Sequence, residues 1–128
     1  MNLAQLLART ARLHPDRPAL LQGEQPVLGY RQLAERVARW AGHLRHGLGL
    51  GPGERVAVFM NNDVAYLEVL YAAWWAGLAV VPINAKLHPR EVEFILGDSA
   101  ASVLFVSEDL AAPLRPLLGG LAALRHVY

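Results

Sequence analysis

Apolar residues recur along the chain at two different spacings. Between Tyr30 and Leu48 they lie three or four residues apart, which is the repeat of one helical face and predicts an α-helix. Elsewhere they form short, almost unbroken runs, which are typical of strands buried on both faces of a parallel sheet. These runs cover residues 55–60, 79–83, 102–106 and 124–128.

Helical signals separate the runs. We expect a helix over residues 63–76, with several possible capping residues at its beginning. Pro89, at a first helical position, begins a helix that reaches Gly97. We expect a further helix over residues 108–118, interrupted at Pro113 and Pro116.

The first part of the chain predicts a helix that ends at His14, before Pro15, and then a small hairpin. The alternation of strands and helices that follows predicts an α/β fold with a mostly parallel sheet, flanking helices and right-handed crossovers. We expect residues 1–128 to form a single domain, since this length suits one domain. The apolar residues 124–128 lead us to expect that the chain is a piece of a longer protein, because domains usually end in exposed polar segments.

Composition argues against several classes of function. A net charge of +1 does not suit a general nucleic-acid-binding protein, which needs a basic excess to meet the phosphates. The absence of cysteine excludes disulfides, thiolate metal sites and a cysteine nucleophile. We expect no transmembrane segment, because Gly77 and Pro82 break the apolar region after Val69, and we expect a cytoplasmic protein.

No spacing of chemically active residues specifies catalysis. The glycines between Gly47 and Gly53 fail the dinucleotide-binding spacing and follow a helix rather than a strand. His43 and His46 lie on the arginine-rich side of their helix, where a solvated face is favoured over a metal site. We therefore assign no catalytic, cofactor-binding or metal-binding residue.

Two sets of residues remain as candidates for binding. Asn84 and Lys86 follow an expected strand at its carboxyl end, where parallel sheets place ligands, although capping a loop is the favoured alternative. The helix over residues 63–76 is apolar nearly all round, which makes Val64, Tyr71 and Trp75 candidates for an interface. The alternative is an ordinary amphipathic helix with one stray Trp.

Several segments, taken in order, resemble the adenylate-forming enzymes: acyl-CoA synthetases, peptide-synthetase adenylation domains and luciferases. Leu28–Leu33 resembles their L-T-Y-x-E-L segment, with Gly29 in place of Thr and Gln32 in place of Glu. Residues 50–57 resemble G-v-x-x-G-D-R-V-A, and residues 76–84 resemble A-G-a-x-x-v-P-l-n. The likeness continues through residues 87–106 and is closest to acyl-CoA synthetases of the long-chain fatty acid-CoA ligase type.

The resemblance implies the N-terminal part of the acyl-CoA synthetase-like fold. The parent enzyme would use ATP and Mg²⁺ to convert a carboxylate, such as a fatty acid, to an acyl-adenylate, and would then transfer the acyl group to CoA. The family's phosphate loop and catalytic lysine have no counterpart in residues 1–128, so we expect this chain alone to be inactive and to bind none of these cofactors.

The resemblance also implies partners. We expect the chain to pack against the remainder of the parent enzyme, and to form a homodimer through the surface left uncovered, either around Trp75 or through the terminal strand. An autonomous, non-catalytic α/β domain with a flavodoxin-like sheet, used for binding or interaction, remains the alternative.

Overall fold

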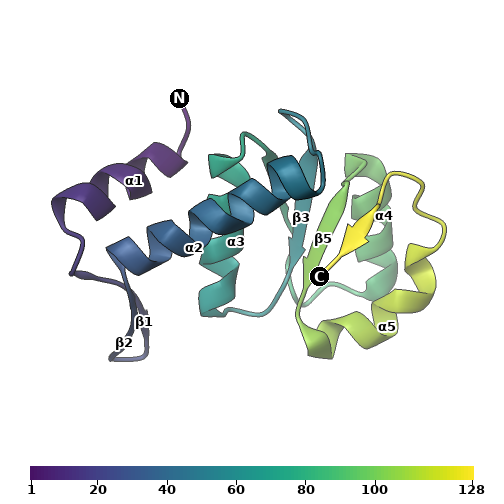
Figure 1. Cartoon of the computed structure of the whole chain (residues 1–128). Coiled ribbons are helices and arrows are strands. Elements are labelled where there is room, and N and C mark those ends of the chain that lie inside the picture. The colour runs from purple at the N-terminus through teal and green to yellow at the C-terminus, as the bar shows by residue number, and fades with distance from the viewer. The chain divides into compact units, whose positions relative to one another are not determined.

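The structure, a computed structural model, describes all residues from 1 to 128 (Figure 1). Its contacts group the residues into two compact units. Unit 1 contains residues 1–52 and 63–78, and unit 2 contains residues 53–62 and 79–128. The α/β fold class is confirmed, while the expectation of a single domain stays a prediction.

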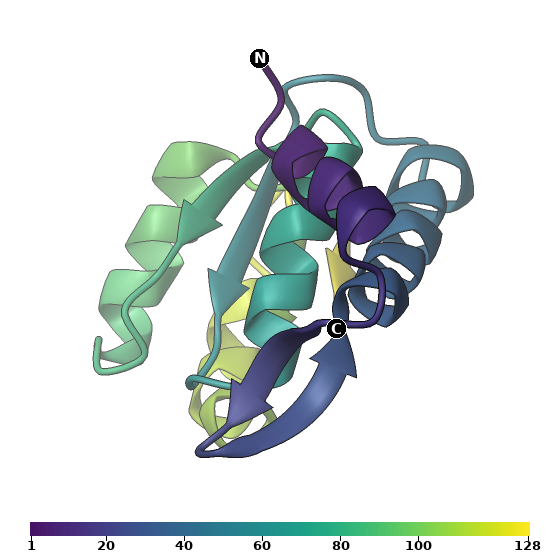
Figure 2. The ribbon, with the colours of Figure 1, turned by 90° about the vertical axis from the view of Figure 1, so that its left-hand side faces the viewer.

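Unit 1 combines three packed helices with a hairpin (Figure 2). Its elements are α1 (Ala4–Leu13), β1 (Pro18–Gln22), β2 (Gln25–Gly29), α2 (Tyr30–Gly42), a π-helical turn η1 (His43–Gly47) and α3 (Val64–Trp75). The strands β1 and β2 pair in antiparallel fashion, as the sequence predicts. Asp63 caps α3 by accepting a hydrogen bond from the backbone N–H of Ala65 at 3.0 Å.

The apolar face of α2 is buried as its spacing predicts. Leu33, Val37 and Ala41 are at most 3% exposed, whereas Arg36 and Arg39 are exposed. The prediction of an α-helix as far as Leu48 is wrong in its last turn, which η1 replaces.

The glycine at position 47 explains this wider turn. The His43 Nδ1 lies only 2.6 Å from where a Cβ on Gly47 would be, so the imidazole takes the space of that missing side chain. The N–H of Leu48 donates to the carbonyl of His43 at 2.9 Å, which is the five-residue hydrogen bond of a π-turn.

Unit 2 is a four-stranded parallel sheet with the order β4-β3-β5-β6. Its elements are β3 (Arg55–Phe59), β4 (Ala79–Pro82), α4 (Pro89–Ser99), β5 (Val103–Val106), α5 (Glu108–Leu118) and β6 (His126–Val127). The helices α4 and α5 pack on the sheet face that carries Ala57, Phe59 and Leu104, and together they form the core. The opposite face, with Val56 and Val58, is buried too, as the unbroken apolar runs predict.

The helix α5 is continuous, so the expected interruption at its prolines is wrong. Pro113 and Pro116 cannot donate to the carbonyls of Asp109 and Ala112. All four residues are exposed, so these carbonyls lie on the side of the helix that faces water. Water can therefore replace the missing hydrogen bonds, and the buried side of α5 keeps Ala111 and Leu114 in the core.

The two edges of this sheet differ. Ala79 donates its N–H to the carbonyl of Glu54, just before β3, and Ile83 donates to Val58 in β3. Because alternate residues of a strand point their N–H groups to the same side, the backbone nitrogen of Pro82 faces outward from the sheet. A proline at this position removes an edge donor at no cost to the ladder. At the other edge His126 donates to the carbonyl of Ser102, just before β5, and Tyr128 donates to Leu104 in β5. The N–H of Val127 between them is directed outward, where another strand could accept from it.

Candidate functional site

The strand order of unit 2 marks one position as the place for a ligand. The first strand of the sheet, β3, lies in the middle, with β4 on one side and β5 on the other. The chain therefore reverses its winding direction between β3 and β5. Open parallel sheets bind ligands outside the carboxyl ends of the strands at such a switch point.

Three polar residues meet at this switch point. The backbone N–H of Asn61, just after β3, donates to the Ser107 Oγ at 3.2 Å. The Asn61 side-chain amide donates to the Asp109 Oδ2 at 2.6 Å. Ser107 and Asp109 lie at the beginning of α5, so these bonds join the ends of β3 and β5. Asn61 and Asp109 are exposed, so their remaining acceptor and donor groups can reach a ligand.

The sequence analysis did not bring these three residues together. Along the chain Asn61 lies in the expected turn before the helix over residues 63–76, and Asp109 lies in the first turn of the helix expected over residues 108–118. The signal that could have found them is the combination of their place directly after two strands and the strand order. That order cannot be read from the sequence, because pairing partners are set by tertiary structure.

Asn84 and Lys86 follow β4, on the other side of β3. The Asn84 Oδ1 accepts a hydrogen bond from the Lys86 N–H at 3.0 Å, and the Leu87 N–H donates to the Asn84 carbonyl at 3.1 Å. Asn84 thus closes the turn after β4, while Lys86 is exposed. No hydrogen bond joins this pair to Asn61, and a role in ligand binding stays a prediction.

A hollow of about 290 Å³ lies between α5 and β6 in the same unit. Val106, Leu114 and Tyr128 contribute to its mostly apolar lining, together with the charged residues Glu108 and Arg115. The Tyr128 ring stacks on Phe105 with the ring centres 5.3 Å apart. This hollow could hold an apolar side chain or a small ligand, but it contains no nucleophile with a base beside it.

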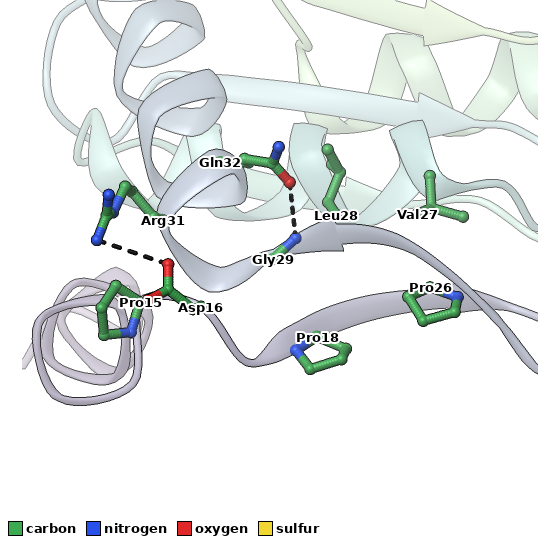
Figure 3. Close-up of a pocket in the computed structure, with 9 residues that line it drawn as sticks. All are labelled: Pro15, Asp16, Pro18, Pro26, Val27, Leu28, Gly29, Arg31 and Gln32. Atoms are coloured by element: carbon green, nitrogen blue, oxygen red, sulfur yellow. Dashed lines mark hydrogen bonds and ion pairs between the residues drawn. The ribbon is translucent and has the colours of Figure 1, made fainter.

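Unit 1 has a larger hollow of about 470 Å³ between the hairpin and the start of α2 (Figure 3). Pro15, Pro18 and Pro26 give it rigid walls. An ion pair between Arg31 and Asp16, 3.6 Å apart, borders it, and both side chains are largely exposed. These groups can bind polar or apolar surface, but they provide no pair for nucleophilic or acid–base chemistry.

The three interface candidates on α3 are half-buried. Trp75 lines a hollow of about 190 Å³ with residues of α1, among them Ala4 and Ala8, so α1 covers part of its side. Val64 and Tyr71 keep part of their surface accessible, and the Tyr71 ring packs edge-to-face on Trp74 at 5.2 Å. Their role in an interface stays a prediction.

No three His, Asp or Glu side chains in the chain gather as metal ligands. The expectation that this chain binds no Mg²⁺ stays a prediction, because Mg²⁺ is usually held by only one or two carboxylates together with phosphates. No helix is both long enough and apolar enough to cross a bilayer.

Comparison with known proteins shows the family. Residues 7–127 match the model that describes AMP-binding enzymes. The chain belongs to the AMP-binding enzyme family.

The curated proteins that the chain resembles include long-chain-fatty-acid–CoA ligases and feruloyl-CoA synthases. The chain is 35% identical over 127 residues to the long-chain-fatty-acid–CoA ligase of Escherichia coli O6:H1, covering 98% of this chain and 22% of that protein. It is 41% identical over 112 residues to the feruloyl-CoA synthase of Amycolatopsis sp., covering 88% of this chain and 22% of that protein. The chain thus spans about a fifth of the length of the curated relatives that it matches.

A solved structure supports the same fold. The N-terminal domain of FACL13 from Mycobacterium tuberculosis superposes with a TM-score of 0.87 at 30% sequence identity. The match covers 98% of this chain and 32% of that structure. The expected family and the acyl-CoA synthetase-like fold are thereby confirmed.

Proposed function

We propose that this chain serves as the N-terminal part of an ATP-dependent acyl-CoA ligase. Such an enzyme joins a carboxylate to the AMP part of ATP with release of pyrophosphate, and then transfers the acyl group to the thiol of CoA with release of AMP. The observation that carries the proposal is the family match over residues 7–127, together with the superposition on an N-terminal domain of the same family. The names of the relatives favour a fatty acid or an aromatic acid as substrate.

The chain's own contribution would be structural. Its parallel sheet of unit 2 supplies a buried layer, with the core residues Ala57 and Leu104 fully enclosed. Its candidate site offers hydrogen-bonding groups without a cation or a cluster of metal ligands. We therefore propose that ATP, Mg²⁺ and CoA would be held by other parts of the enzyme, and that the chain alone catalyses no adenylation.

A chimera tests the proposal. This chain would replace the matching segment of the Amycolatopsis feruloyl-CoA synthase, to which it is 41% identical, and ATP–pyrophosphate exchange would be measured with ferulate. We expect exchange by the chimera and none by the 128-residue chain alone. As a matched control, the same chimera with Ala57→Asp, a charge at a fully buried position, should lose activity.

If the chain is instead an autonomous binding domain, we expect a different result from the chimera experiment. The order β4-β3-β5-β6 is shared with flavodoxin-like sheets, so the strand order alone does not separate the two functions. If the chimera folds but shows no exchange, the ligase proposal fails. Exchange by the isolated chain, abolished by a substitution such as Asp109→Asn, would mean that the chain carries an active site that we have not recognised.

A further inference from the structure

Large apolar side chains stay exposed along one side of α1. Leu3, Leu6 and Leu13 are 46%, 58% and 62% exposed. Together with Thr10 they lie three or four residues apart, so they form one line along the helix. We refer to Leu3, Leu6, Thr10 and Leu13 as the leucine stripe.

The leucine stripe can be buried without leaving a polar group unpaired. Its one polar side chain is Thr10, whose hydroxyl donates to the carbonyl of Leu6 at 2.8 Å. Burial of an unpaired hydroxyl would oppose docking, but this one is already paired inside the helix. The stripe therefore presents an effectively apolar surface.

Cations lie beside the leucine stripe on α1, and the helix itself carries no acidic residue. Arg9 and Arg12 are exposed on the adjoining side of α1, and residues 1–15 contain no Asp or Glu. The first acid along the chain, Asp16, lies beyond the helix and pairs with Arg31. The outward side of α1 is thus apolar along one edge and positively charged along the other.

The helix is held with this side outward. The Asn2 side chain accepts from the Ala4 N–H at 2.9 Å and donates to the carbonyl of Trp74, at the end of α3, at 2.6 Å. Ala4 and Leu7 are buried on the inner side of α1. Docking would therefore not require the helix to form first, which removes an entropic cost.

We propose that the leucine stripe, with Arg9 and Arg12, docks α1 on an anionic lipid surface. Aliphatic side chains beside cationic ones suit the boundary between acyl chains and anionic headgroups. The long arginine side chains can reach the headgroups while the leucines enter the apolar layer. Charge complementarity favours this occupant over an uncharged protein groove, which would gain nothing from the two arginines. The inference does not depend on the proposed ligase function.

Vesicle flotation tests the proposal with the full 128-residue chain. We expect binding to vesicles of equimolar phosphatidylcholine and phosphatidylglycerol, weakened by salt, and little binding to phosphatidylcholine alone. A basic residue near an anionic surface contributes about 1 kcal/mol, roughly fivefold in affinity, so Arg9→Gln with Arg12→Gln should weaken binding about 25-fold. Leu6→Gln with Leu13→Gln should abolish flotation.

Control substitutions on unit 2 distinguish binding through the leucine stripe from nonspecific binding to vesicles. Phe94 is 71% exposed and Lys86 is exposed, so Phe94→Gln and Lys86→Gln change an apolar and a cationic side chain that belong to unit 2 and not to α1. Circular dichroism would establish that every variant is folded. The proposal is overturned if the control variants lose as much binding as the α1 variants, or if no vesicle binds the wild-type chain. It is also overturned if the leucine variants remove a self-association seen without lipid, because the stripe would then belong to a second copy.

Discussion

Removal of Arg36 should destabilise the protein more than removal of its partner Glu68. Glu68 lies on α3 with its side chain 4% exposed, and Arg36 lies on α2 with its side chain 51% exposed. The Arg36 Nε is 2.7 Å from the Glu68 Oε1, and a second guanidinium nitrogen donates to the Oε2 at 3.2 Å. The Oε1 is buried and receives no aligned hydrogen bond, so the nearby positive charge is its main compensation.

The magnitude follows from this unequal burial. Breaking a fully buried ion pair costs about 3–5 kcal/mol, and an exposed pair contributes about 0–1 kcal/mol. Because Arg36 is half-exposed and screened by water, we expect Arg36→Met to lower the free energy of unfolding by about 2 kcal/mol. Glu68→Met leaves Arg36 free to meet water and places an apolar group in an apolar site, so its cost should stay below about 1 kcal/mol.

Urea denaturation of the two single variants and the double variant would measure the difference. The double variant should unfold close to Glu68→Met, because the unpaired buried carboxylate is gone, and the cycle should give a coupling of about 2 kcal/mol. Arg39→Met, an exposed arginine one turn along the same helix, is the matched control and should change stability by less than about 0.5 kcal/mol. Equal costs for Arg36→Met and Glu68→Met would refute the reasoning from unequal burial.

Other perturbations test separate parts of the structure. Gly29→Ser should raise stability by about 0.5–1 kcal/mol in thermal unfolding. A Cβ at this N-cap meets nothing closer than 3.4 Å, and the serine side chain can supply the capping hydrogen bond that glycine lacks. A loss of stability would mean that the added side chain does not fit. Gly47→Ala should lower the free energy of unfolding by about 1 kcal/mol, because the added methyl group displaces His43 from its edge contact with Trp40. Gly42→Ala, with open space around it, should raise the free energy of unfolding by a similar amount. Equal effects of the two substitutions would contradict this account of the π-turn. Self-association remains a proposal: if copies pair through β6, Val127→Pro should lower the association seen by sedimentation across a concentration series, and an unchanged profile would point instead to the surface around Trp75.

The sequence predicts the elements of the fold well because local signals and burial agree in them. The run from Arg55 becomes a strand enclosed on both faces, and Pro89 opens α4 where its fixed backbone angle suits a first helical turn. The predictions of secondary structure are wrong where the surroundings of a residue offset its usual effect on the backbone. The prolines of α5 do not interrupt the helix, because their lost hydrogen bonds face water, and Gly47 permits a wider turn because His43 fills its missing side chain.

The polar contacts could not be predicted, because spacing along the chain does not determine them. In the sequence, Glu68 is one of several acidic residues, and nothing nearby marks its partner. In the structure Glu68 is buried and pairs with Arg36, which lies 32 residues away. In the same way Asn61 and Asp109 are 48 residues apart, and they meet only because β3 and β5 are neighbours in the sheet. Each of these pairs depends on strand order or helix packing, which the apolar residues establish first. In this chain the hydrophobic pattern therefore determines where polar chemistry can occur, and the identity of the polar residues at those positions determines which chemistry is possible.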